Sequence, residues 1–347
     1  MLVMMVFETV IRRVEEGVTL GGDEAAEVMG CVADGGVSTG DIVRFLEAYN
    51  RRVPSVEELT AFVRVLRERA VRVAAPAGNT ICNCGTGGDG RGTVNVSTMA
   101  AFVIAACGIP VAKHGNRSVS SRCGSTDCLS RLGVRASRSA AEAGGLLSET
   151  GLCFMNAPDF HPAMRQVADA RRELARRGCK TIFNLLGPML NPAGVRRQCM
   201  GVFDESLVEP VGEVLLRTGT ERAYVMHGDG YDEITLTGPT RVAMIADGGV
   251  TTRVLTPEEM GLRRCDAASL QGGDAEANAR VAEGVLGGGV DGPVAEMVVV
   301  NAAAGISAGS NDNEDIVDAI AMAREALVSG RAYEMLRTMR RKAPADA

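Results

Sequence analysis

Residues 79–116 read NTICNCGTGGDGRGTVNVSTMAAFVIAACGIPVAKHGN, and this stretch decides the fold class. It holds a short strand pattern at 80–84, a glycine-rich turn, an apolar helix pattern at 97–107 and a second strand pattern at 109–112. Strands that alternate with helices in this way predict a mostly parallel sheet with helices on its faces. The sequence therefore predicts an α/β fold around this segment.

The same alternation continues toward the C-terminus. Residues 125–132 have the pattern of a helix, which Gly133 closes. Later strands are expected at three places, namely 223–227, 241–245 and 297–300. This spacing extends the predicted sheet over most of the second half of the chain.

The first 73 residues have helical patterns instead. Ser55 and Glu58 form a capping box for a helix expected over 56–73. An earlier helix is expected over 23–34, and Thr39 is expected to be the N-cap of the next one. This region predicts a separate bundle of helices.

A helical segment in the middle of the chain interrupts the α/β pattern. Residues 162–178 are typical of one long amphipathic helix. We expect residues 1–75 to form a small helical domain on which the middle segment, about 162–185, packs. Residues 76–161 and 186–347 then form the larger α/β domain.

Composition bounds the class of protein. The chain has 347 residues and a net charge of −6, and domains that bind nucleic acid are usually basic, so we expect no nucleic-acid partner. No stretch of about 18 apolar residues lacks charges, so we expect no membrane span. No secretory signal pattern is present at the N-terminus, which indicates a cytoplasmic protein with reduced thiols.

The ten cysteines do not have the spacing of a common zinc site. Cys82 and Cys84 are separated by one residue, and Cys123 and Cys128 by four, so neither pair has the C-x2-C spacing. On a strand, Cys82 and Cys84 project to the same face. This pattern favours small buried side chains.

The segment 85–126 has the composition of a phosphate-binding site. Gly85–Gly90 matches G-x-G-x-x-G, but no Asp or Glu lies between Arg91 and Thr126 to hold a nucleotide ribose. The loop is therefore interpreted as a phosphate and sugar cradle. Ser97 and Thr98 begin an apolar helix, where unpaired amides favour an anion.

Other polar residues are expected to complete this site. Lys113 follows a strand, at the end where α/β sheets bind ligands, and Ser125 begins a second helix. Asp232 and Glu233 also follow a strand, and adjacent carboxylates opposite a phosphate cradle predict a magnesium site. The three histidines of the chain, His114, His161 and His227, all lie in polar clusters at strand or helix ends.

These motifs together resemble the anthranilate phosphoribosyltransferase family over nearly the whole chain. The matching stretches are Gly85–Asp89, Asn95–Thr98, Lys113–Arg117, Ser120–Ser121, Gly124–Ser125 with Asp127, Ala157–Pro158, His161–Met164, Thr181–Pro188, Asn191–Pro192, His227–Gly230 and Asp232–Glu233. The resemblance implies a nucleoside phosphorylase/phosphoribosyltransferase-like fold with a helical domain, through which members usually form homodimers. It implies transfer of the 5-phosphoribosyl group of phosphoribosyl pyrophosphate (PRPP) to the amine of anthranilate, in tryptophan biosynthesis.

The resemblance also implies roles for individual residues. Ser97, Asp232 and Glu233 would hold Mg²⁺. PRPP would be held by Gly85, Gly88, Asp89, Thr93, Asn95, Ser97, Thr98, Lys113 and Ser125. Anthranilate would be held by Gly85, His114, Asn116, His161 and Arg171, with Arg171 facing its carboxylate. No residue is expected to act as a general acid or base.

The chain departs from the family pattern near the acceptor. Ala175–Arg177 is an insertion of about three residues beside Arg171, so Arg172, Arg176 or Arg177 are alternative partners for the acceptor carboxylate. Asn156 replaces an apolar residue. These departures leave open a different aromatic or nucleobase acceptor with the same donor. A nucleoside phosphorylase is disfavoured by the paired acids, and a catalytically silent binding protein by the full set of site residues.

Overall fold

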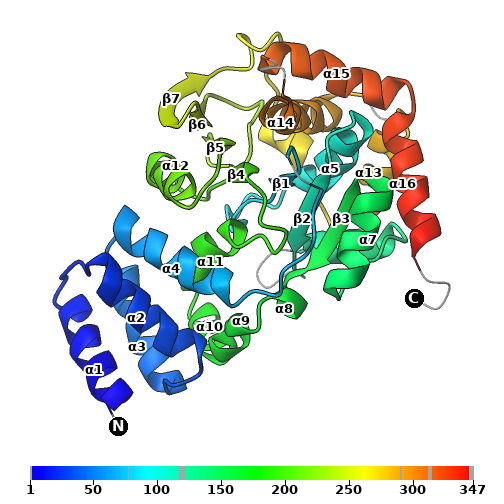
Figure 1. The fold of residues 1–347 in the computed structure, drawn as a ribbon. Coiled ribbons are helices and arrows are strands. Elements are labelled where there is room, and N and C mark those ends of the chain that lie inside the picture. The colour runs from blue at the N-terminus through cyan, green and yellow to red at the C-terminus, as the bar shows by residue number, and fades with distance from the viewer. Residues whose placement is uncertain (1, 77, 117–121, 290, 312–314, 344–347) are drawn as a thin grey trace.

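One seven-stranded sheet organises the larger part of the molecule (Figure 1). The computed structural model describes residues 2–76, 78–116, 122–289, 291–311 and 315–343. The strand order is β3-β2-β1-β4-β5-β6-β7. The strands are β1 (Ile81–Asn83), β2 (Val111–Gly115), β3 (Leu152–Asn156), β4 (Arg197–Gly201), β5 (Arg222–Gly228), β6 (Thr240–Ala246) and β7 (Gly249–Leu255).

Strand pairing confirms the predicted fold class. The strands β3, β2, β1, β4 and β5 are all parallel to one another. At the end of the sheet, β6 is antiparallel to β5, and β7 is antiparallel to β6. The carboxyl ends of the parallel strands therefore lie along one edge of the sheet. This edge carries the residues that follow Asn83, Gly115 and Gly201.

Helices cover both faces of the sheet. On one face α5 (Val96–Ala106) packs against α14 (Pro293–Gly309), and on the other α12 (Val208–Arg217) packs against β5 and β6. The remaining helices of this part are α6 (Ser125–Arg131), α7 (Ala140–Thr150), α8 (Ala157–Phe160), α13 (Ala275–Leu286), α15 (Ile316–Val328), α16 (Arg331–Lys342) and the short 3-10 turns η1 (Gly187–Met189), η2 (Glu205–Leu207) and η3 (Ala267–Leu270). No helix among the described residues is long and apolar enough to cross a membrane.

The N-terminal helices form the second part of the molecule, at the lower left of Figure 1. They are α1 (Leu2–Glu15), α2 (Gly22–Ala33), α3 (Thr39–Asn50) and α4 (Val56–Glu68). The middle helices α9 (Ala163–Gln166), α10 (Ala168–Arg176) and α11 (Ile182–Leu186) pack with them in one apolar cluster that includes Phe45, Leu174 and Phe183. The same cluster continues through Val211 of α12 to Val225 of the sheet, so the two parts share a packed interface.

Local capping explains where some of these helices begin. The Glu58 amide donates to Ser55 Oγ (3.1 Å), and the Ser55 amide donates to Glu58 Oε2 (2.8 Å), so the predicted capping box is confirmed. The helix ends at Glu68, before the predicted residue 73. The N-cap of α3 is Ser38, not Thr39, because Ser38 Oγ accepts from the Asp41 amide (3.2 Å).

Two further predictions were wrong. Residues 297–300 lie inside α14 and are not a strand. The run Met297–Val300 is buried on all sides, and periodicity cannot separate a buried strand from a buried helix. The segment 162–178 is not one helix, since Val167 separates α9 from α10.

Candidate active site

Lys113 and Ser97 meet at the carboxyl edge of the sheet. The prediction that Lys113 follows a strand was wrong, because pairing with β3 continues through Gly115 and Lys113 lies within β2. Lys113 is almost fully buried; its Nζ donates to the Asn83 carbonyl (2.6 Å) and to Ser97 Oγ (3.2 Å). The Asn83 side chain in turn donates to the Ser97 carbonyl (2.7 Å). The first turn of α5 is thereby fixed to β1 and β2. The structure thus brings together a cation and a hydroxyl predicted for the donor site.

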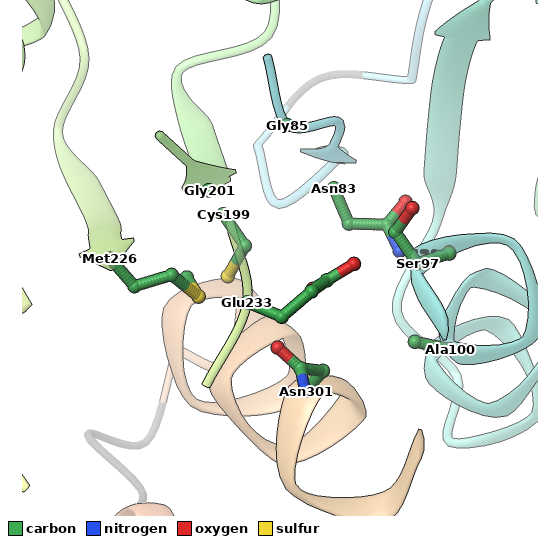
Figure 2. Close-up of a pocket in the computed structure, with 9 residues that line it drawn as sticks. All are labelled: Asn83, Gly85, Ser97, Ala100, Cys199, Gly201, Met226, Glu233 and Asn301. Carbon is green, nitrogen blue, oxygen red and sulfur yellow. Dashed lines mark hydrogen bonds between the residues drawn. The ribbon is translucent and has the colours of Figure 1, made fainter. Parts of the chain in front are cut away.

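A small pocket lies directly beside this group. Figure 2 shows the Glu233 carboxylate reaching into it from the segment after β5, toward Ser97 on α5. The lining residues are Asn83, Gly85, Ser97, Ala100, Cys199, Gly201, Met226, Glu233 and Asn301. Two of the three residues predicted to hold metal, Ser97 and Glu233, therefore line the same pocket.

Asp232, the third of these residues, contacts the glycine-rich loop. Its Oδ2 accepts from the Gly87 amide (2.6 Å). A Cβ atom added at Gly85 would lie 2.9 Å from Asp232 Oδ2, and one added at Gly201 only 1.5 Å from the Asp232 carbonyl oxygen. Because no side chain fits at these distances, the two glycines allow the acidic segment to approach the glycine-rich loop and the end of β4 closely.

Burial raises the pKa values of the two acidic residues of the site. Burial, with the nearby charge of Asp89, raises the pKa of Asp232 to about 7. Burial and the charge of Asp232 raise the pKa of Glu233 well above its usual range, while Lys113 opposes the shift. Buried carboxylate oxygens beside a hydroxyl are the donors that a hard divalent cation prefers, so these residues fit Mg²⁺.

Several buried polar atoms of the site lack a hydrogen-bond partner among the described residues. They are Asn83 Oδ1, Thr86 Oγ1 and Thr98 Oγ1. Buried polar groups are normally paired, so unpaired atoms that gather in one place indicate that a ligand completes the site. Thr98 lies in the first turn of α5, where the helix dipole favours an anion.

The remaining predicted donor residues do not line the pocket of Figure 2. Asn95 is the N-cap of α5, and its Oδ1 accepts from Asn278 (2.9 Å). Thr93 pairs with Gln271 in an isolated bridge. Ser125 begins α6, and its Oγ contacts the Asn116 carbonyl (3.4 Å). Asp89 Oδ1 accepts from the Arg91 amide (3.0 Å), and Gly88 has left-handed backbone geometry, with φ of 77°.

The predicted acceptor residues include two neighbouring histidines. The ring centroids of His114 and His161 are 6.1 Å apart, and both side chains are buried. Burial, together with His114, lowers the pKa of His161 to about 3, so the ring is neutral near neutral pH. His161 Nε2 has no partner among the described residues. A neutral imidazole with an open nitrogen can bind a substrate.

Arg171 differs from the other arginines of its helix. Its guanidinium lies 5.9 Å from the Phe183 ring centroid, and burial lowers its pKa. No carboxylate pairs with it among the described residues, whereas Arg172 pairs with Asp169 and Arg177 pairs with Glu47 and Glu173. Arg176 of α10 also has no acidic partner among the described residues, but it is exposed, whereas Arg171 is half-buried and therefore has the stronger requirement for an anion.

The other expected residues differ in how close they lie to the pocket. Gly85, expected on both substrates, lines the pocket with Ser97. His227 bonds the Val202 carbonyl through Nδ1 (2.7 Å), which ties β5 to the loop after β4. Asn116 is exposed at the end of β2. Arg117, Ser120 and Ser121, which belong to the family resemblance, lie outside the described residues.

Sequence reasoning missed four residues that organise the site. The amide of Ile234, next to Glu233, donates to Asn301 Oδ1 on α14 (2.9 Å), and Asn301 Nδ2 donates to the Ile234 carbonyl (2.8 Å). Its one signal in the sequence is a polar residue directly after the apolar run 297–300. Arg91 donates to the carbonyls of Asp229 (2.8 Å) and Gly230 (3.2 Å). The third is Asn83, which donates to the Ser97 carbonyl. The fourth is Lys180, whose Cε would lie 3.4 Å from a Cβ atom added at Gly88.

The fold and site define a glycosyl transferase. A glycosyl transferase family a/b domain matches residues 77–333, and a glycosyl transferase family helical bundle domain matches residues 8–70. Anthranilate phosphoribosyltransferase of Rhodopseudomonas palustris (strain BisB18) is 46% identical over 334 residues, which cover 96% of this chain and 97% of the relative.

Solved structures agree in fold. The anthranilate phosphoribosyltransferase of Thermus thermophilus has a TM-score of 0.89 at 40% identity, over 96% of this chain and 98% of its own. The Saccharomyces cerevisiae enzyme in complex with PRPP and Mg has a TM-score of 0.85 over 97% of each chain, and at 23% identity it shows the fold alone. The chain belongs to the anthranilate phosphoribosyltransferase family.

Proposed function

We propose that this chain transfers the 5-phosphoribosyl group of PRPP to the amine of anthranilate and releases diphosphate, a step of tryptophan biosynthesis. The observation that carries the proposal is the meeting of three elements at one edge of the sheet. Lys113 reaches Ser97 at the start of α5, Glu233 lines the same pocket, and Asp232 accepts from the Gly87 amide. Family membership supplies the substrate class.

The donor is held by amides, hydroxyls and one cation. In this proposal the glycine-rich loop and the first turn of α5 bind the phosphates, and Lys113 compensates the charge of the departing diphosphate. The donor-binding set is Gly85, Gly88, Asp89, Thr93, Asn95, Ser97, Thr98, Lys113 and Ser125. Mg²⁺, held by Ser97, Asp232 and Glu233, would neutralise further diphosphate charge when bound.

The acceptor needs orientation more than activation. The amine of anthranilate is attached to an aromatic ring, so it is weakly basic and already neutral near pH 7. The ribosyl carbon gains oxocarbenium character as diphosphate leaves, as in glycoside cleavage. A strong general base is therefore unnecessary, and positioning with electrostatic stabilisation accounts for the rate.

Arg171 is proposed to bind the acceptor carboxylate, with Gly85, His114, Asn116 and His161 along the acceptor path. The support is that Arg171 is half-buried and has no acidic partner among the described residues. The insertion Ala175–Arg177 motivated a different acceptor, but Arg177 is already paired with Glu47 and Glu173. Arg176, also in the insertion, has no acidic partner among the described residues but is exposed to solvent, and anthranilate remains the proposed acceptor.

The assembly and compartment are also proposals. We propose a homodimer through the helical domain, which rests on the family resemblance, and light scattering during gel filtration measures it. We propose that the enzyme works in the cytoplasm. The absence of a disulfide among the ten cysteines, all of which the structure describes, is compatible with reducing conditions.

The proposed reaction is tested by its products. The purified chain, incubated with PRPP, anthranilate and Mg²⁺, should form phosphoribosyl anthranilate, detected by mass spectrometry, together with an equal amount of diphosphate. Diphosphate release without the coupled product would mean that another acceptor, or water, takes the ribosyl group.

A further inference from the structure

We propose that Cys82, Cys84 and His114 form a binding site for one thiophilic metal ion, such as Zn²⁺, next to the substrate pocket. Their ligand atoms, two Sγ and one imidazole nitrogen, all lie within 4.8 Å of one another. Two come from the β1 strand region and one from β2, its direct neighbour in the sheet. The spacing of the cysteines alone does not indicate this site, because the third ligand comes from a different strand.

The distances match the chemistry of such an ion. Cys82 Sγ lies 3.6 Å from His114 Nδ1. In a tetrahedral zinc site, metal bonds of about 2.3 Å to sulfur and about 2.0 Å to nitrogen place these two atoms about 3.5 Å apart. An ion therefore fits between Cys82 and His114 with little movement of either. Two thiolates and an imidazole are soft ligands that select Zn²⁺ or Cu⁺ over Mg²⁺.

A hydrogen bond from His114 Nε2 leaves Nδ1 available to bind the metal ion. Its Nε2 lies 2.9 Å from the Gly187 carbonyl oxygen, which can only accept, so Nε2 carries the proton and Nδ1 keeps its lone pair. Metal-binding histidines commonly use this arrangement with a backbone carbonyl. The Asn191 amide, 3.3 Å from Nδ1, is the group that an ion would displace, and it keeps its bond to the Ala112 carbonyl (2.7 Å).

The surrounding charges favour binding. Burial tends to raise the pKa of Cys82, but the hydrogen bond with Cys84 and the charge of Lys113 lower it below its ordinary value. The hydrogen bond with Cys82, and burial, raise the pKa of Cys84 well above its ordinary value. A bound cation would favour the deprotonated form of both thiols. Binding of Zn²⁺ releases the protons and leaves a neutral buried unit.

Occupancy of this site should inhibit the enzyme. Cys84 directly precedes Gly85 of the donor loop, and His114 belongs to the proposed acceptor path. An ion bound to Cys84 and His114 would fix the positions of both side chains, and the His114 imidazole could then no longer contact the substrate. This inhibition rests on the proposed function, whereas metal binding itself does not.

Metal binding is tested with Cd²⁺ on the full chain, kept reduced with a phosphine. Cd²⁺ should produce the ultraviolet charge-transfer band of cadmium thiolate, saturating at one ion per chain. Cys82→Ser and Cys84→Ser should each weaken this binding by more than about 100-fold, beyond the loss typical of an outer-sphere contact. The double variant Cys123→Ser/Cys128→Ser, which changes the other close pair, and Cys179→Ser, which removes an exposed thiol, should keep the band.

The proposal is overturned if the band survives in Cys82→Ser and Cys84→Ser, or if only Cys179→Ser removes it. Circular dichroism establishes that each variant is folded. In turnover assays Zn²⁺ should inhibit the unmodified chain at a fixed excess of Mg²⁺, and Cys84→Ser should resist. Inhibition that is equal in Cys84→Ser, and relieved by more Mg²⁺, would place the inhibitory ion at the carboxylates. A chain that binds Cd²⁺ as predicted but has no turnover would contradict the proposed function and leave the metal site standing.

Discussion

The Gly87 amide donates to Asp232 Oδ2 at 2.6 Å, and this bond joins two loops that are 145 residues apart in the chain. One loop follows β1 and the other follows β5. The contact places the proposed phosphate cradle against the proposed Mg²⁺ ligands. It also explains why the glycine-rich loop contains no larger residue at Gly85, where a Cβ would meet the same carboxylate.

Removing the charge of Asp232 and Glu233 should abolish Mg²⁺-dependent turnover. In Asp232→Asn/Glu233→Gln the amides keep the shape of the site but bind a hard cation poorly, so kcat/KM should fall at least about 1,000-fold. The fold should survive, since each amide replaces a buried carboxyl group of nearly the same shape. Steady-state rates over a Mg²⁺ titration measure the effect, with the exposed Asp266→Asn as the control. An unchanged Mg²⁺ dependence would remove both residues from the metal site.

Gly201→Ala should disable the site by steric displacement. Its Cβ would lie 1.5 Å from the Asp232 carbonyl oxygen, so the acidic segment must move. We expect turnover to fall by about 100-fold or more, as when a reacting group is displaced by about 1 Å. Gly145→Ala is the matched control: nothing lies within 4 Å of its Cβ position inside α7, so it should stabilise the protein by roughly 0.5–1 kcal/mol. Normal activity in Gly201→Ala would show that this segment adapts freely.

Arg171→Ala should affect the acceptor selectively. If Arg171 binds the anthranilate carboxylate, its loss removes a charge-assisted hydrogen bond and raises the KM for anthranilate about 10- to 100-fold. The KM for PRPP should change little. Arg172→Ala, which removes a guanidinium already paired with Asp169, is the control and should leave both values near those of the unmodified chain. Equal effects of Arg171→Ala on both substrates would place the carboxylate contact elsewhere.

His161 should make the fold sensitive to acid. Its pKa is about 3 in the folded chain, below the ordinary value of 6.5, so the unfolded state binds the proton first. The stability it contributes is complete above pH 6.5 and is lost as the pH falls toward 3. Between pH 7 and pH 5 the loss is about 2 kcal/mol.

Urea unfolding at pH 7 and pH 5 measures this loss. His161→Asn and His161→Gln, which do not titrate in this range, should each lose about 2 kcal/mol less than the unmodified chain over the same interval. An identical loss in the variants would mean that other groups account for the acid sensitivity.

Local patterns predicted much of this molecule because local physics determined it. The glycine-rich turn, the start of α5 and the capping box at Ser55 all depend on neighbouring residues. The same reasoning was wrong at 297–300, where packing between α5 and α15 selects a helix for a run of β-branched residues. The break at Val167 likewise depends on packing that no periodicity encodes.

The site was partly predictable for the same reason. Ser97 and Glu233 were expected because helix starts and the segments after strands are recognisable in sequence, and Lys113 was expected at a strand end although it lies within β2. Asn301 and the group of Cys82, Cys84 and His114 were not predicted, because their contacts form only when segments distant in the sequence pack side by side. The open charge of Arg171 could not be distinguished from that of Arg177 until their partners were located.

The most direct test of the central claim is the loss of anthranilate fluorescence after PRPP is added, with Mg²⁺ and with a chelator in its place. The account predicts a loss that requires PRPP, requires Mg²⁺ and is absent in Asp232→Asn/Glu233→Gln. If fluorescence stays constant in a folded chain that binds PRPP by calorimetry, anthranilate is not the acceptor and the account of the site is contradicted.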